Sequence, residues 1–148
     1  MNEKYIITIN APVSPDEIVF VREENTKELD LWQSCIAQSL CIVSARIGES
    51  DSDQKGALVG IGFLVGNARH GQIVDLVVHS AHRGKGLGGM IFDALVIYAK
   101  DLGIRYLGLT YDKKDPWLKD FYERHGFNQI DFAMWEKECL AALNYKQL

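Results

Sequence analysis

Positive charge is scarce in this chain. Among its 148 residues, 16 are Lys or Arg and 20 are Asp or Glu, so the formal net charge is −4 at pH 7. A nucleic-acid partner requires a basic face that neutralises phosphates, and this balance argues against one. The same balance is compatible with a cationic acceptor such as a primary amine.

Long apolar runs are also lacking, and no hydrophobic stretch could span a bilayer. The first ten residues include Glu3 and Lys4 and do not have the arrangement of a signal peptide. We therefore expect no membrane partner and a cytoplasmic location.

Cysteine occurs only as Cys35, Cys41 and Cys139, an odd number with no CxxC pair. This pattern argues against a disulfide framework and against a zinc site, so we expect no metal ion. Each cysteine is interpreted as a small hydrophobic residue of the core.

The composition is that of an ordinary globular protein, with 47% hydrophobic and 24% charged residues. The length suits one domain with one core. No internal repeat, low-complexity tract or proline-rich linker divides the chain. We therefore expect a single domain over residues 1–148.

Hydrophobic periodicity and turn residues predict a series of strands and helices. The predicted helices cover residues 15–22, 26–40, 84–102 and 116–125. The predicted strands cover residues 5–10, 41–47, 57–65, 72–78 and 106–110, with one or two more between 127 and about 136. The C-terminal tail could hold a further short helix. Short loops between successive strands indicate antiparallel pairing, and the later strand–helix–strand order indicates a parallel crossover. The expected fold class is α+β, with a mixed sheet flanked by helices.

Several predicted helices carry their own start and stop signals. Ser14 is a predicted N-cap that precedes a proline, and Glu17 completes a capping box with it. Asp115 precedes a proline in the same way and is a second predicted N-cap. Gly103 and Gly126 are expected to end the helices before them.

The most informative segment is a glycine-rich turn between a predicted strand and a predicted helix. It consists of His79, Ser80, Ala81, His82, Arg83, Gly84, Lys85, Gly86, Leu87, Gly88 and Gly89. Glycine lets a backbone approach a ligand closely, and the first turn of a helix offers unpaired N–H groups at a positive dipole end. With the added charges of Arg83 and Lys85, the turn is typical of a pyrophosphate site.

Other interpretations of this turn are weaker. One is a tight turn that binds no ligand. Four glycines and two cations would then lower the stability of the fold without any bound ligand to compensate. Residues 84–89 also match the GxGxxG pattern of dinucleotide-binding folds, but they follow a five-residue loop and short-looped strands instead of opening a doubly wound sheet. A Walker A loop needs Ser or Thr after the lysine, and Gly86 follows Lys85.

The order Arg83-Gly84-Lys85-Gly86-Leu87-Gly88 resembles the (Q/R)xxGx(G/A) acyl-CoA pyrophosphate loop of the GNAT superfamily. Residues 76–83 resemble the strand and loop that lead into it, with Ser80 in place of a frequent proline. The resemblance extends over roughly residues 41–127 and implies acetyl-CoA as co-substrate. It also implies that the backbone amides of residues 84–89 hold the pyrophosphate.

The same resemblance implies that the strand before the turn splays from its neighbour. Leu76, Val77 and Val78 would then lie beside the coenzyme. Leu76 and Val78 would offer backbone groups to the pantetheine arm and the thioester carbonyl, where such amides can stabilise an oxyanion. The alternative is that Leu76 and Val78 are ordinary core residues of the strand. Both interpretations can hold at once, because the coenzyme contact would involve only their backbone groups.

A second motif, Phe121-Tyr122-Glu123-Arg124-His125-Gly126-Phe127, resembles the FYxxxGF ending of the GNAT fold. By that resemblance Tyr122 protonates the leaving thiolate, a suitable task for a phenol with a pKa of about 10. The alternative is that these aromatic residues only pack in the core. The family often has Asn at the position of Asp115, so we do not expect a direct coenzyme contact there.

Direct transfer to an alkyl amine requires a base, because an ammonium group has no lone pair for attack. Asp75 is the predicted base, and His79 is a second candidate on the same strand and loop. The alternatives are a hydrogen-bonded strand residue for Asp75 and a solvated loop residue for His79. Gln72 could contact the substrate but cannot act as a base.

The segment before the second predicted strand forms the substrate wall in folds of this kind. Its candidate contacts are aromatic or acidic, namely Phe20, Glu23, Glu24, Glu28, Asp30 and Trp32. A core position for Trp32 and a solvated helix face for the acids are the alternatives.

We therefore predict an N-acetyltransferase in which an amine attacks acetyl-CoA directly in a ternary complex. Small-molecule and peptide amines are both candidate acceptors, and a homodimer is plausible for this fold. The alternative function is a non-catalytic acyl-CoA-binding or sensing module on the same fold.

Overall fold

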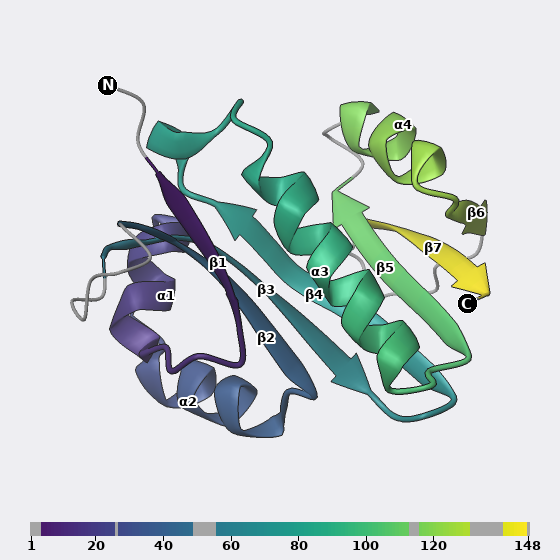
Figure 1. The fold of residues 1–148 in the computed structure, drawn as a ribbon, viewed down its shortest axis with the longest axis horizontal. Helices are drawn as coiled ribbons and strands as arrows, with labels where there is room; N and C mark the ends of the chain where they lie inside the picture. The colour runs from purple at the N-terminus through teal and green to yellow at the C-terminus, as the bar shows by residue number, and fades with distance from the viewer. Residues whose placement is uncertain (1–3, 26, 49–55, 113–115, 131–140, 148) are drawn as a thin grey trace.

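The computed structural model describes residues 4–25, 27–48, 56–112, 116–130 and 141–147. Within these residues seven strands form one sheet in the order β1-β2-β3-β4-β5-β7-β6 (Figure 1). Neighbouring strands are antiparallel except β4 and β5, which are parallel. The predicted mixed sheet is confirmed.

The order of the elements also agrees with the prediction. The strands are β1 (Tyr5–Ile9), β2 (Cys41–Ile47), β3 (Leu58–Gly66), β4 (His70–Val78), β5 (Tyr106–Asp112), β6 (Asn128–Ile130) and β7 (Ala141–Gln147). The helices are α1 (Pro15–Arg22), α2 (Leu29–Gln38), α3 (Leu87–Asp101) and α4 (Pro116–Arg124), with a 3-10 turn at Ser80–His82.

The C-terminal tail was expected to have room for a helix, and that expectation is wrong. Residues Ala141–Gln147 form β7, which pairs with β5 on one side and with β6 on the other. Those long-range hydrogen bonds override the weak local preference of the segment for a helix. Of the strand residues predicted from 127 to 136, only Asn128–Ile130 are seen as a strand, and residues 131–136 lie outside the described chain.

Two helices begin later than predicted. Helix α2 begins at Leu29 and ends at Gln38, within the expected 26–40. Helix α3 begins at Leu87 instead of Gly84, because Gly84 and Gly86 have φ values of +79° and +80° that no right-handed helix can hold. The predicted cap Asp115 lies outside the described residues.

The two faces of the sheet carry different helices. Helices α1 and α2 cover one face and α3 covers the other (Figure 1). Side chains of β2 alternate accordingly: Cys41 and Val43 pack in the cluster with α3, whereas Ile42 packs in the cluster with α1 and α2. Helix α3 lies so close that a Cβ at Gly60 would approach Ile91 Cδ1 to 2.8 Å.

The sheet opens between β4 and β5, as Figure 1 shows. Their pairing covers only His70–Ile73 against Tyr106–Leu109. Just beyond it, β4 contains a bulge opposite β3 between the pairs Phe63–Val74 and Ile61–Val77. Asp75 lies in this bulge with φ +53°. A bulge bends its strand, so it directs the end of β4 away from β5.

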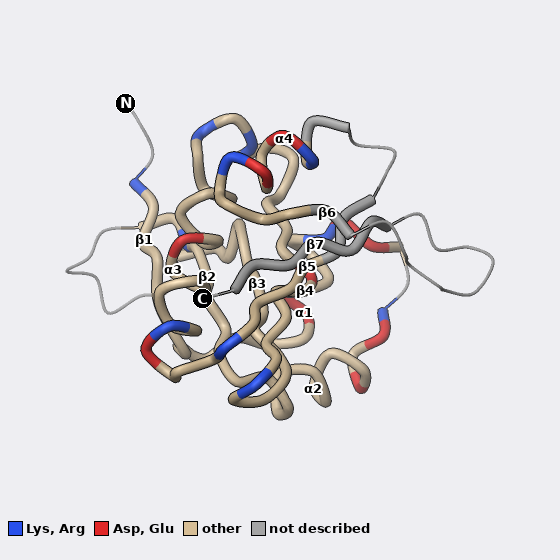
Figure 2. The backbone as a smooth tube through the Cα atoms, turned by 90° about the vertical axis from the view of Figure 1, so that its right-hand side faces the viewer, with Lys and Arg blue, Asp and Glu red and all other residues tan. Residues whose placement is uncertain are grey.

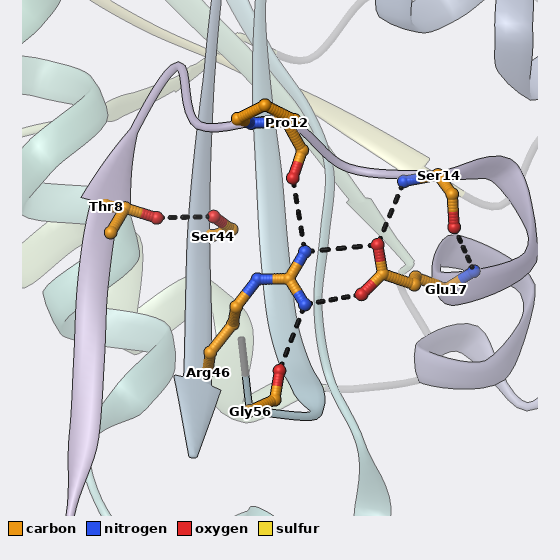
Figure 3. Close-up of polar contacts among 7 residues, drawn as sticks. All are labelled: Thr8, Pro12, Ser14, Glu17, Ser44, Arg46 and Gly56. Carbon is orange, nitrogen blue, oxygen red and sulfur yellow. Dashed lines mark hydrogen bonds and ion pairs between the residues drawn. The ribbon is translucent and has the colours of Figure 1, made fainter. Parts of the chain in front are cut away.

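A buried arginine fastens the start of α1 to the sheet (Figure 3). Arg46 of β2 forms a two-point ion pair with Glu17 and donates to the carbonyl groups of Pro12, at 3.2 Å, and Gly56, at 3.1 Å. Glu17 in turn accepts from the Ser14 N–H at 3.0 Å, and Ser14 caps Glu17, which confirms the predicted capping box.

Replacing Arg46 with methionine should lower the free energy of unfolding by about 2–3 kcal/mol. The change leaves the partly buried Glu17 carboxylate and two carbonyl groups without their donor. The Arg46 hydrogen bond holds the pKa of Glu17 below its usual value. This contribution is therefore complete above about pH 4.3 and is lost as the pH falls through the lowered pKa. Urea denaturation at pH 7 and at pH 3.5 tests both statements. An equal loss at the two pH values would contradict the coupling to Glu17.

Charges of both signs are interspersed around the described chain instead of gathering on one face (Figure 2). None of the described helices is both long and apolar enough to cross a membrane. No three His, Cys, Asp or Glu side chains of the described residues are grouped so that they could hold a metal ion. Cys41 is a free, buried thiol whose pKa is raised to about 11 by burial, and Cys35 is free and half-buried. Cys139 lies outside the described residues.

Candidate active site

A cavity of about 670 Å³ lies where the end of β4, the start of α3 and one face of α4 meet. It is lined by Leu76, Val77, Val78, His82, Arg83, Gly84, Gly86, Leu87, Gly88, Gly89, Leu118, Phe121 and Tyr122. The structure thus brings together the two motifs found in the sequence. Of the residues predicted to contact the coenzyme or catalyse the reaction, Lys85 and Asp75 are not part of the lining.

The glycine-rich turn points a set of backbone amides into this cavity region. The first α-helical bond of α3 runs from the Met90 N–H to the Gly86 carbonyl group at 3.1 Å. The N–H groups of Leu87, Gly88 and Gly89 precede that bond and have no acceptor within the helix. Gly86, the N-cap, has no side chain to satisfy them. The helix dipole adds partial positive charge at the same place, so the turn suits an anion.

The glycines leave room for such an anion. A Cβ atom added at Gly84, Gly86 or Gly89 would meet no atom within 4 Å, and one at Gly88 would meet only Val78 Cγ2, at 3.9 Å. Internal packing therefore does not require glycine at 88 and 89, where each glycine costs about 1 kcal/mol of helix stability relative to alanine. A group that approaches the backbone closely does require it. The residues present fit a bound pyrophosphate.

The two cations of the turn are held by other parts of the chain. Arg83 donates from Nε to the Val78 carbonyl group at 2.9 Å, and its side chain is well exposed. Lys85 donates from Nζ to the Tyr5 hydroxyl group at 3.0 Å. Arg83 lines the cavity and adds positive charge to it, whereas Lys85 lies outside the lining.

The backbone of Val78 faces the opening beside β4. Val78 lies opposite Gly60, and the next residue, His79, donates its N–H to the Val59 carbonyl group at 2.8 Å. In an antiparallel ladder this makes Val78–Gly60 a non-hydrogen-bonded pair, whose N–H and C=O groups point away from the partner strand. The Val78 N–H is therefore directed to the side where β5 has separated.

Tyr122 reaches the cavity from α4. Its side chain is 7% exposed and packs against Phe92, with ring centroids 5.6 Å apart, and against Phe121, at 5.2 Å. Burial raises the pKa of the Tyr122 phenol to about 12. The hydroxyl group therefore keeps its proton at any physiological pH. The two sequence interpretations of Tyr122 are compatible, because one residue is both packed in the core and part of the cavity wall.

This order of elements and motifs has counterparts among known proteins. A model of the acetyltransferase (GNAT) family matches residues 13–127. The chain belongs to the GNAT family of acetyltransferases. The match includes the glycine-rich turn, the end of β4 and all of α4.

Solved structures show the same GNAT fold at low sequence identity. A Bacillus subtilis acetyltransferase in complex with CoA is 16% identical, with 98% of this chain and 99% of that chain covered and a TM-score of 0.70. A GNAT family acetyltransferase from Elizabethkingia anophelis with acetyl-CoA bound is 16% identical, with 96% and 98% covered and a TM-score of 0.66. An IAA acetyltransferase from Bacillus cereus is 16% identical, with 98% and 100% covered and a TM-score of 0.71.

In this GNAT protein the predicted base, Asp75, lies outside the cavity lining. Its exposed carboxylate is 3.5 Å from Nη1 of Arg22, the last residue of α1. Asp75 is thus near the helices of the α1 face, whereas Leu76 and Val78 pack with the α3 cluster.

The second candidate base, His79, is engaged in the loop itself. Its Nδ1 accepts the Ala81 N–H at 3.1 Å, which places the proton of the neutral ring on Nε2. Nε2 is 3.5 Å from Glu23 Oε1. Both ring nitrogens have partners, and the geometry favours a structural role for His79.

Glu23 is predicted as part of the substrate wall, but the sequence does not reveal that it contacts the glycine-rich turn. It ends α1 with φ +56° and accepts from the Ser80 hydroxyl group and from the Ser80 N–H, at 3.3 Å. Its carboxylate is also 3.9 Å from Arg83 Nη2. The Ser80 hydrogen bond lowers the pKa of Glu23. Glu23 therefore holds the glycine-rich turn against the end of α1.

Three further lining residues were not predicted. Phe121 is the first residue of the FYxxxGF motif, and Leu118 lies one helical turn before it, so helical spacing from that motif could have identified Leu118 as well. His82 belongs to the glycine-rich turn, but no pattern in the turn singles out its side chain. In the expected substrate wall, Phe20 is 56% exposed and stacks on His79 at 4.9 Å, whereas Trp32 is a core residue beneath Arg22.

Proposed function

We propose that this GNAT protein is an N-acetyltransferase that transfers an acetyl group from acetyl-CoA to an amine by direct attack in a ternary complex. One observation carries the proposal: a single cavity joins the glycine-rich turn, the backbone edge of β4 and the Tyr122 side chain. The bound coenzymes of the B. subtilis and E. anophelis structures support it. We further propose a small-molecule or peptide amine as acceptor and a cytoplasmic location.

Each part of the cavity has a role in this proposal. The amides at the start of α3, with Arg83 and Lys85, hold the pyrophosphate. Leu76, Val77 and Val78 lie along the pantetheine arm, and the Val78 N–H donates to the thioester carbonyl oxygen, where negative charge develops. Bound acetyl-CoA supplies the thioester that the amine attacks.

Tyr122 donates its proton to the departing sulfur. Its pKa of about 12 exceeds the ordinary value of a thiol, about 8.5, by more than three units in water. The cavity is not water, however, and burial alone raises the pKa of the Cys41 thiol to about 11. A thiolate that leaves beside the buried Tyr122 side chain is likewise poorly solvated and more basic than in water, which favours proton transfer from Tyr122.

We propose that Asp75 removes the proton of the acceptor amine through water. Replacing it with glycine should leave stability within about 1 kcal/mol, because glycine accepts φ +53° without strain. Turnover at pH 7 should fall about 100-fold or more, since a positioned acid or base typically contributes about 100- to 10,000-fold. The loss of turnover should become smaller as the pH approaches the pKa of the amine, about 10, because the amine is then neutral without a base.

Asp75→Asn is the matched variant, since asparagine also tolerates a positive φ and keeps the side-chain volume. Both variants should show the same pH-dependent loss in a thiol-release assay. A loss that is independent of pH, or that appears in only one of the two, would assign Asp75 to structure and leave the base to another group.

Binding of the coenzyme is the first test. Acetyl-CoA and CoA, but not NAD, should raise the melting temperature in a saturable manner. Thiol release with a panel of small amines and peptides then separates catalysis from binding. No shift with millimolar CoA would overturn the proposed function, and binding without turnover of any amine would favour an acyl-CoA sensor.

A further inference from the structure

We propose that His125, just after the end of α4, is a positioning residue that fixes Tyr122 for proton transfer to the departing sulfur. The inference rests on the proposed function, because it takes Tyr122 as the general acid. It concerns one hydrogen bond within the last turn of α4 and the ring contacts that join this turn to α3.

The backbone at the end of α4 turns two N–H groups toward the Tyr122 carbonyl group. The His125 N–H, which a continuing α-helix would direct to Phe121, bonds to the Tyr122 carbonyl oxygen at 3.0 Å instead. The Phe127 N–H bonds to the same oxygen at 3.1 Å. The Phe121 carbonyl group therefore needs a donor from outside the regular helix pattern.

The imidazole of His125 supplies that donor. Its Nδ1 lies 2.7 Å from the Phe121 carbonyl oxygen. A carbonyl oxygen can only accept, so Nδ1 carries the proton of this bond. Nδ1 is protonated in this neutral tautomer and in the imidazolium ion alike, so the bond does not depend on the charge of the ring. A side chain thus closes the helix end beside Tyr122.

The same imidazole packs against α3 through the ring of Phe92. The two ring centroids are 5.1 Å apart, and Phe92 is 1% exposed. The ring of Phe92 is also contacted by those of Phe121, Tyr122 and Phe127, with centroids 5.6 to 5.9 Å away. Because α3 begins at the glycine-rich turn, these contacts set where Tyr122 lies relative to a bound coenzyme.

A carboxylate of α3 lies near His125 but contributes little. Nε2 of His125 is 3.9 Å from Asp93 Oδ1, and the two side chains are 31% and 64% exposed. An ion pair this open to water adds little to stability. The hydrogen bond to Phe121 is therefore the contact that fixes the turn, and the ion pair is not.

The position of the Tyr122 hydroxyl group matters because proton transfer requires hydrogen-bond reach to the sulfur. A misplacement of about 1 Å can cost about 100-fold in rate. Loss of the His125 hydrogen bond would loosen the last turn of α4 and leave the glycine-rich turn unchanged. We therefore expect kcat to fall while the affinity for acetyl-CoA is kept. His125 acts through Tyr122 and touches neither substrate.

The test is the thiol-release assay with saturating acetyl-CoA and two variants of His125. His125→Phe keeps a ring and removes the donor, so it should lower kcat about 10-fold with the KM for acetyl-CoA within about 2-fold. His125→Asn removes the ring but places an amide donor near the position of Nδ1, so kcat should stay within about 3-fold of the wild type. A role in packing alone predicts the reverse order of the two variants, and that order would overturn the inference. Should His125→Phe fail to fold, as judged by its melting curve, His125→Leu takes its place, since leucine also lacks a donor.

A double variant shows whether His125 acts through Tyr122. In the Tyr122→Phe background, His125→Phe should change the residual kcat less than about 2-fold, because the hydroxyl group that it positions is gone. A further loss of about 10-fold in that background would contradict the inference. Asp93→Asn is the control beside the same imidazole and should leave kcat within about 2-fold at pH 7. A loss in Asp93→Asn equal to that in His125→Phe would assign the effect to the ion pair and overturn the inference.

Amide hydrogen exchange of the Phe127 N–H gives a readout that needs no turnover. This N–H bonds to the Tyr122 carbonyl group, so it should exchange about 10-fold faster in His125→Phe and within about 3-fold of the wild-type rate in His125→Asn. Unchanged exchange in His125→Phe would overturn this inference and leave the proposed function intact. A wild type that binds CoA but acetylates no amine would overturn the proposed function, and the role of His125 in catalysis with it.

Discussion

Gly88→Val should reduce the affinity for CoA at least about 100-fold and leave the protein folded. Gly88 lies in the first turn of α3, where a Cβ would project into open space with only Val78 Cγ2 at 3.9 Å. The added side chain would occupy the space from which an anion reaches the amides of α3. Loss of two charge-assisted hydrogen bonds, each worth about 1.5–3 kcal/mol, accounts for a loss of this size.

Gly88→Ala should have opposite effects on stability and on CoA binding. Alanine is the better helix former by about 1 kcal/mol, so the ligand-free variant should melt at a higher temperature than the wild type while binding CoA more weakly. Titration calorimetry and thermal melting measure the two effects separately. Lys100→Val, on the exposed side of the same helix near its C-terminal end, is the control and should bind CoA normally. Unaltered affinity in Gly88→Val would show that the glycine-rich turn does not hold the coenzyme.

The order of the elements was predictable because most of them carry local signals. The capping box at Ser14 begins α1, and Gly103, with φ +75°, follows the end of α3. Each of these signals involves only a few adjacent residues. Strand β7 has no such signal. Its identity depends on pairing with β5 and β6, which are formed by residues elsewhere in the chain. A propensity-based expectation fails at such a segment.

The candidate site divides in the same way. The glycine-rich turn and Tyr122 belong to compact motifs, and the structure places both at one cavity. Glu23 meets Ser80 across 57 residues and Tyr5 meets His82 across 77. No pattern within a segment encodes such contacts. The position of Asp75 depends on the bulge in β4, which is seen only in the pairing of β4 with β3.

Tyr122→Phe should lower kcat about 100- to 10,000-fold, the range that a positioned general acid contributes. The change removes one oxygen and keeps the ring that packs against Phe92 and Phe127. Stability should therefore stay within about 1 kcal/mol, and the affinity for CoA should stay unchanged. The measurement is thiol release under saturating acetyl-CoA with the best amine of the panel.

The pH dependence separates an acid from a packing residue. A general acid must be protonated, so activity that depends on Tyr122 falls only as the pH rises through its pKa of about 12. The wild type should show no loss of kcat from this group between pH 7 and about pH 10. Tyr98→Phe is the control, because its hydroxyl group accepts from Asn10 Nδ2 at 3.2 Å and does not line the cavity. Equal turnover in Tyr122→Phe and Tyr98→Phe at every pH would restrict Tyr122 to packing, because both changes remove the same atom and only one removes it from the cavity.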